Sequence, residues 1–136
     1  MRRLFPLILA LGLSGCTNEM KWEQQYAQER VALANSSVPV NYKTDILAFM
    51  RTYLNDPTGI RDAYVSEPTR REIQGTERFV SCVRYNAKKS SGQYAGSKDS
   101  LVLYRYGRLD HLIDNGREAC KDAAYRPFPE LERLTR

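Results

Sequence analysis

An uncharged apolar run near the start of the chain limits how much of the sequence can form a folded domain. It covers residues 4–13 and follows two arginines, Arg2 and Arg3. The run is too short to cross a bilayer as a helix, which takes about 20 apolar residues. A short apolar run behind a positive start is typical of a secretory signal peptide. The sequence therefore predicts a signal segment at 1–15, which leaves residues 16–136 to build one modest core.

The signal segment ends in Leu13-Ser14-Gly15-Cys16. This sequence resembles the bacterial lipobox, in which a peptidase cuts before a cysteine that carries a diacylglycerol. The resemblance implies that Cys16 is the lipidated mature N-terminus. Such a terminus would anchor the protein, because two or more acyl chains hold a protein stably on a membrane. The alternative is an ordinary signal peptide with a cysteine nearby by chance. An aspartate directly after the lipidated cysteine favours the inner membrane, and this chain has Thr17 at that position. We therefore expect a periplasm-facing protein in the cell envelope, on the outer membrane rather than the inner membrane.

The chain has three cysteines, and the predicted lipid takes one of them. Cys82 and Cys120 remain, in a compartment where disulfides form. Two free thiols or a redox pair are alternatives, although a redox pair usually has the closer Cys-x-x-Cys spacing. A zinc site would need more ligands than these cysteines and the single histidine provide. We therefore expect a structural disulfide between Cys82 and Cys120, closing a loop of about 39 residues.

Residues 16–41 are polar, rich in Gln and Glu, and are interpreted as a lipidated tether with a transient helix over 20–34. The globular domain is expected at 42–136. It begins with the clearest helix, 43–55, which ends before Pro57. The apolar residues of this helix fall on one stripe, as expected for a helix that covers a core: Ile46, Leu47, Met50, Tyr53 and Leu54.

Beyond this helix, β-branched and aromatic residues predict strands separated by polar turns. The strand segments are 60–66, 78–86, 100–106 and 109–113, with turns at Gln74-Gly75, 88–96 and Gly107-Arg108. The expected fold is α+β, with one amphipathic helix packed on an antiparallel meander of about four strands. The disulfide would staple the irregular C-terminal tail to a central strand.

No motif in the sequence points to catalysis. His111 is the single histidine, and the nucleotide-binding, serine-hydrolase and zinc-protease motifs are missing. Asp110, His111 and Asp114 are too few ligands for a convincing metal site. The net charge of +5 falls to +3 when Arg2 and Arg3 leave with the signal segment. We therefore expect no enzyme activity, no cofactor, no metal and no nucleic-acid partner.

Four motifs lie in the middle of the chain, about residues 54–96. They are a helix ending in Asp-Pro, a strand with a cysteine, an Asn-Ala-Lys turn and a Gly-x-Tyr-x-Gly loop: Asp56-Pro57, Cys82, Asn86-Ala87-Lys88 and Gly92-Gln93-Tyr94-Ala95-Gly96. This pattern is similar to that of small uncharacterised bacterial envelope lipoproteins. The resemblance implies an envelope location and the fold, and it adds no catalytic residue.

Together these features predict a membrane-anchored lipoprotein that acts as a binding or structural component of the cell envelope, with another envelope protein as its partner. The alternative is a periplasm-facing module that binds a small ligand through the loop Gly92–Gly96. Tyr94 lies in this polar loop and Lys88 and Lys89 precede it, which makes these three the candidate recognition residues. The competing interpretation is that Tyr94 folds back over the edge of the sheet.

Overall fold

The computed structural model describes the backbone from Cys16 to Arg136 and the side chains from Met20 onward. The predicted signal segment, residues 1–15, and the Cys16 side chain expected to carry lipid lie outside the described residues. The chain divides into two compact units, Met1–Val31 and Ala32–Arg136. Most of helix α1 belongs to the first unit, and every other helix and strand belongs to the second.

Helix α1 spans Cys16–Ser36 and replaces the transient helix expected over 20–34 with one continuous element. Its Glu, Gln and Ala residues are good helix formers. The Gln25 amide donates a hydrogen bond to the Glu29 carboxylate one turn later, at 3.4 Å. The rings of Trp22 and Tyr26 meet edge to face, with centroids 5.9 Å apart. No helix in the described part of the chain is both long and apolar enough to span a membrane.

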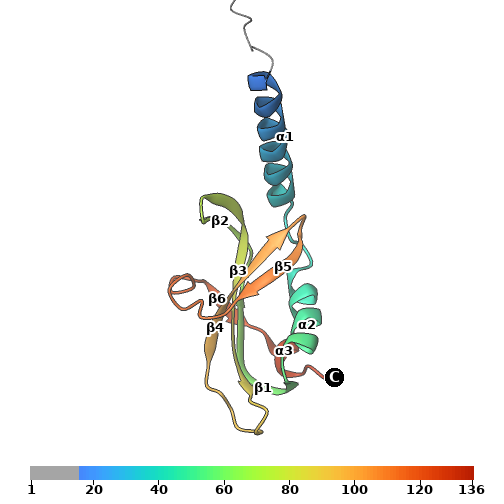
Figure 1. Cartoon of the computed structure of the whole chain (residues 1–136). Helices are drawn as coiled ribbons and strands as arrows, with labels where there is room; N and C mark the ends of the chain where they lie inside the picture. The colour runs from blue at the N-terminus through green and yellow to red at the C-terminus, as the bar shows by residue number, and fades with distance from the viewer. Residues whose placement is uncertain (1–15) are drawn as a thin grey trace, which may run out of the picture. The chain divides into compact units, whose positions relative to one another are not determined.

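An antiparallel sheet of six strands forms the frame of residues 32–136 (Figure 1). The strands are β1 Asp56–Ser66, β2 Thr69–Ile73, β3 Thr76–Lys88, β4 Lys98–Arg105, β5 Arg108–Ile113 and β6 Tyr125–Pro127. Their order is β5-β4-β3-β1-β6, and β2 pairs with the first part of β3. The predicted α+β class with an antiparallel sheet is confirmed, with six strands instead of about four.

Strands β2 and β6 are the two that the sequence pattern did not reveal. In β2, Arg70, Arg71 and Glu72 interrupt the alternation of apolar residues that marks a half-buried strand. Strand β6 has only three residues and ends in Pro127, a residue that ordinarily argues against a strand. Both strands form because β3 and β1 have backbone N–H and C=O groups that need partners. The local sequences of β2 and β6 carry no sign of those groups.

Two tight turns fix the register of the hairpins. Gln74 and Gly75 join β2 to β3 and have φ values of 51° and 74°. Tyr106 and Gly107 join β4 to β5 with φ values of 51° and 71°, one residue earlier than the predicted turn. Two central residues with positive φ are characteristic of the type I′ turn, whose twist suits antiparallel strands.

One face of the sheet is covered by helices α2 (Tyr42–Tyr53) and α3 (Pro129–Glu132), which lie on the same side of it (Figure 1). Ile46 and Met50 of the predicted stripe are fully buried there. They pack against alternate residues of three strands and against the C-terminal segment. The other buried members of this cluster are Ile60, Ala63, Val65, Val83, Tyr85, Ala87, Val102, Tyr104, Phe128, Leu131 and Leu134.

A buried carboxylate ties α2 to the edge of the sheet. Asp45 accepts hydrogen bonds from Arg108 Nε at 2.9 Å and from the Leu109 N–H at 3.2 Å. Asp45 lies in the first turn of the helix, where an acidic residue suits the helix dipole. Its side chain is only 6% exposed, so its main partners are the two donors from β5.

The opposite face of the sheet is covered by the segment that follows β5. Val80, Leu101 and Leu103 face this side and pack around the disulfide between Cys82 and Cys120, which confirms the predicted pairing. Cys82 lies in β3, the central strand, so the tail is attached where the sequence analysis expected it. The segment runs so close to β4 that a side chain on Gly116 would lie 2.8 Å from the Leu101 nitrogen. Only glycine permits this approach.

The disulfide predicts a stability difference that chemical denaturation can measure. The double variant Cys82→Ala with Cys120→Ala should lose about 4 kcal/mol of unfolding free energy, the loop-closure entropy of a crosslink of this length. The native chain should lose a similar amount in reductant, whereas the double variant should be insensitive to it. Alkylation of both cysteines in unreduced, envelope-derived protein would contradict the pairing.

Candidate functional site

A break between β1 and β2 shapes the sheet beside β3. Val65 pairs with Val83 and Thr69 pairs with Val80. Three residues between β1 and β2, 66–68, therefore lie opposite two residues of β3, Ser81 and Cys82. The extra residue forms a bulge that includes Pro68, which has no N–H to give to a ladder. Bulges bend a strand and are common beside functional sites. A hollow in the protein surface lies beside this bulge.

A side chain replaces the ladder hydrogen bond that is lost at the bulge. The backbone N–H of Cys82 donates to Ser66 Oγ at 2.8 Å, and both residues are buried. A buried N–H without an acceptor would cost about 1–3 kcal/mol. Ser66 therefore stabilises the bulge.

A cavity of about 460 Å³ opens at the bulge, within the size range of ligand sites in proteins. Its lining combines apolar residues with charged residues of both signs. The apolar residues are Val80, Cys82, Ala119, Ala123 and Ala124. The charged residues are Glu67, Arg71, Glu118, Lys121, Asp122 and Arg126. An apolar lining with mixed charges suits an apolar side chain attached to a polar backbone better than it suits a fully charged ligand.

The wall of this cavity is the segment 118–126, and three connections hold it in place. Cys120 is bonded to Cys82. The Arg71 guanidinium donates to the Ala119 carbonyl and so links β2 to the same segment. The segment ends in β6, whose Arg126 pairs with Val65 of β1.

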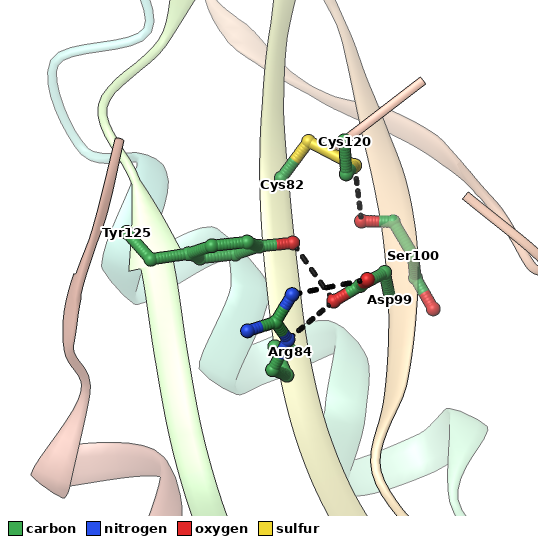
Figure 2. A network of polar contacts seen from close by, with 6 residues as sticks. All are labelled: Cys82, Arg84, Asp99, Ser100, Cys120 and Tyr125. Atoms are coloured by element: carbon green, nitrogen blue, oxygen red, sulfur yellow. Dashed lines mark hydrogen bonds and ion pairs between the residues drawn. A yellow bond between two sulfur atoms is a disulfide. The ribbon is translucent and has the colours of Figure 1, made fainter. Parts of the chain in front are cut away.

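A polar network next to the disulfide attaches the segment a fourth time (Figure 2). Arg84 donates to Asp99 twice, from Nε to Oδ1 at 2.7 Å and from Nη2 to Oδ2 at 3.2 Å. The Tyr125 hydroxyl donates to Asp99 Oδ1 at 3.0 Å. The Arg84 guanidinium also lies 4.4 Å from the centre of the Tyr125 ring. Side chains from β3, β4 and β6 are thereby joined around one carboxylate.

The network keeps its members in fixed protonation states. The hydrogen bond from Arg84 lowers the pKa of Asp99, while partial burial opposes this and the Tyr125 hydroxyl adds to it. Burial, followed by the hydrogen bond to Asp99, raises the pKa of Tyr125. Asp99 is therefore an anion and Tyr125 a neutral donor at neutral pH, which makes the network a stable attachment of the segment to β3 and β4.

A second hollow of about 830 Å³ lies beyond this network and is more open. Its lining is polar and carries both signs of charge: Asp62, Tyr64, Arg84, Ser97, Lys98, Asp99, Asn115, Arg117 and Lys121. Arg84 and Asp99 already neutralise each other there. Lys121 also lines the first cavity, so the two hollows are neighbours on the sheet.

The predicted recognition residues lie elsewhere, and none of them lines the cavity at the bulge. Tyr94 is folded back on β1, with its hydroxyl donating to the Gly59 carbonyl at 2.7 Å. The Arg61 guanidinium lies 4.0 Å and Lys88 Nζ lies 5.8 Å from the centre of the Tyr94 ring. Lys89 is exposed. The structure therefore has the folded-back tyrosine that was the competing interpretation.

The residues considered for metal binding also occupy separate places. His111 is exposed, with Nδ1 3.0 Å from Asp110 Oδ2. Asp114 instead accepts hydrogen bonds from the Tyr53 hydroxyl and from Lys98. Within the described part of the chain, no group of three or more His, Cys, Asp or Glu side chains is arranged to hold a metal ion.

Sequence reasoning missed the residues that build the cavity, chiefly Ser66, Arg71 and Ala123. One signal was present, because Pro68 separates two segments that both pair with the same strand. A proline between two strand-like runs marks a bulge as readily as a turn. The cavity wall had no such signal, since its position depends on the disulfide and on the network around Asp99.

Comparison with known proteins gives no match to a family model, a curated protein or a solved structure.

The network predicts a stability loss that depends on pH. Asp99→Asn should cost about 2 kcal/mol at pH 7, because the bonds to Asp99 involve charged groups in a partly buried place. The pKa of Asp99 is lowered by folding, so its contribution is present above the unfolded pKa and lost as pH falls through the folded value. Unfolding free energies at pH 7 and pH 3 should therefore differ less in the variant than in the native chain.

The matched control for this measurement is Glu77→Gln, which breaks the ion pair with Arg70 at 3.5 Å. Both of these side chains are largely exposed, so the change should cost less than about 1 kcal/mol. Equal losses from Asp99→Asn and Glu77→Gln would show that the network contributes no more than a surface pair.

The folded-back position of Tyr94 predicts a graded effect. Tyr94→Phe should cost about 1 kcal/mol, since it removes only the hydrogen bond to Gly59. Tyr94→Ala should cost about 3 kcal/mol because the ring packing is lost as well. Thermal or denaturant unfolding of the two variants checks this order, and an unchanged stability for Tyr94→Ala would mean that the ring is free for recognition.

Proposed function

We propose that this chain is a lipid-anchored component of the bacterial cell envelope that binds another envelope protein. The observation that carries the proposal is the arrangement of its three cysteines. Two of them, Cys82 and Cys120, are paired in the structure, and the third, Cys16, ends a sequence that resembles a lipobox. A structural disulfide suits an oxidising compartment outside the cytoplasm, where lipobox proteins reside.

The binding role is supported by the cavity at the bulge. This hollow of about 460 Å³ lies beside a strand edge and has the size of a ligand-binding site. The loop Gly92–Gly96 supports the small-ligand alternative less well, because Tyr94 is engaged with Gly59 and Arg61 of its own sheet. A ligand at this loop would first have to displace those contacts.

The anchoring part of the proposal is tested by the variant Cys16→Ser. The native chain should be found in the membrane fraction, with diacylglycerol on Cys16 as its first residue by mass spectrometry. The variant should remain uncleaved and carry no acyl chain, because the alkylated thiol is missing. The control is Cys82→Ser with Cys120→Ser, which should be acylated normally. A mature N-terminus without lipid at any other residue would overturn the anchoring.

A further inference from the structure

We infer that the outer edge of β2 binds an extended segment of another protein, which adds to the sheet as a strand in line with β6 and places an apolar side chain in the cavity at the bulge. This inference deepens the proposed function by naming the kind of partner and the way it is held. It rests on that function only for its location in the envelope, and the binding itself does not require the lipid.

The turn between β2 and β3 determines which backbone groups of β2 face outward. In a two-residue hairpin the residues that flank the turn, Ile73 and Thr76, form a hydrogen-bonded pair. The ladder then alternates, so Arg71 and Thr69 also direct their N–H and C=O groups toward β3. The N–H and C=O groups of Arg70 and Glu72 must therefore point away from β3.

Those outward groups have no strand beside them. Within residues 32–136, β3 is the only strand that pairs with β2. Strand β6 occupies the equivalent edge of β1 only as far as Ser66, where its Tyr125 forms the last pair. Because β2 continues β1 beyond the bulge, a strand added to β2 would continue the line that β6 begins.

The cavity lies where the side chains of such a strand would point. Thr69 and Arg71 line the cavity, so these β2 side chains mark the face of the sheet on which it opens. Residues directly opposite each other on paired strands place their side chains on the same face. A partner residue opposite Thr69 or Arg71 would therefore face the apolar part of the lining, formed by Val80 and Ala123.

The other edge of the sheet does not offer the same site. At β5, the outward N–H of Leu109 is already bound to the Asp45 carboxylate at 3.2 Å. Helix α2 packs beside β5, and the register shifts between Leu103 and Tyr104. Bulges and covering elements are common ways of preventing an edge strand from pairing. Strand β2 follows a bulge and carries charged side chains, but no described strand of residues 32–136 pairs with its outer edge.

The partner is expected to have the chemistry of a strand-forming segment. Main-chain hydrogen bonds provide affinity in strand addition, and pockets for alternate side chains provide specificity. The cavity favours an apolar side chain at one position. The charged residues around it include the pairs Arg126–Glu67 and Lys121–Glu118, which are mutually neutralised at 3.7 Å and 4.0 Å. No strong charge preference is therefore expected at the neighbouring positions.

The test uses the purified full chain and a yeast-displayed library of ten-residue peptides with random sequence. Selected peptides should carry an apolar residue at the position that faces the cavity, within a strand-forming segment whose side chains alternate between the two faces of the sheet. The affinity of the tightest binders should be measured by fluorescence anisotropy. Arg70→Pro should weaken binding about tenfold or more, because it removes an outward N–H without breaking the β2–β3 ladder. Arg70→Gln is the matched control, since it removes the charge and keeps the N–H, and it should bind within about threefold of the native chain.

Two further measurements keep the result decisive if Arg70→Pro disturbs folding. Ala123→Leu should fill the cavity and weaken the selected peptides about tenfold, with the edge of β2 unchanged. Bound peptide should slow hydrogen exchange of the Glu72 amide, as monitored by NMR. Failure to select any binder, equal binding to Arg70→Pro in its folded form, or unchanged Glu72 exchange would overturn the inference. These results are independent of the Cys16→Ser experiment, which reports only on anchoring.

Discussion

The attachment of the C-terminal segment to β3 is the constraint on which the rest of the sheet's second face depends. Two neighbouring positions on β3 make it, Cys82 through the disulfide and Arg84 through its double hydrogen bond to Asp99 (Figure 2). Tyr125 joins the same carboxylate from β6. Without these contacts the segment would be held over Val80 and Leu101 by little more than the hydrogen bond from Arg71 to Ala119 and the short pairing of β6 with β1, and the wall of the cavity at the bulge would be weakened.

The two faces of the sheet are stabilised in different ways because a small chain has limited apolar surface to bury. Helices α2 and α3 cover one face with a continuous apolar cluster that includes Phe128 and Leu131. The other face has few large apolar side chains, and its covering segment has no helix or strand from Asp114 to Ala124. On that face the disulfide and the charged network provide the stability that apolar packing provides on the first face. Such a design suits a compartment in which disulfides persist.

The bulge between β1 and β2 has consequences beyond its own geometry. It allows the long strand β3 to be paired along one side by two successive strands, and β6 can accompany only the first of them. Ser66 compensates the hydrogen bond lost at the break, so the irregularity costs little stability. The result is an edge that is partly closed by β6 and partly open along β2, with a cavity at the junction. An open strand edge is well suited to hold an extended segment of another protein.

The sequence by itself determined the properties that depend on local pattern. The stripe containing Ile46 and Met50 identified α2, β-branched and aromatic residues identified the long strands, and glycine-containing turns such as Gln74-Gly75 located the hairpins. The cysteine count and the predicted compartment were enough to pair Cys82 with Cys120. The candidate recognition residues were a different matter, because a tyrosine such as Tyr94 can be free or folded back with the same local sequence.

Only the tertiary structure decided which edges and hollows exist. Strand β2 is charged and β6 is three residues long, so each becomes a strand only because another strand lies beside it. The cavity combines residues from 66 to 126, and its volume follows from the placement of one irregular segment. Pairing of distant strands and crosslinking of a tail are long-range events. A local pattern records the propensity of a segment, and it cannot record which backbone groups elsewhere remain unpaired.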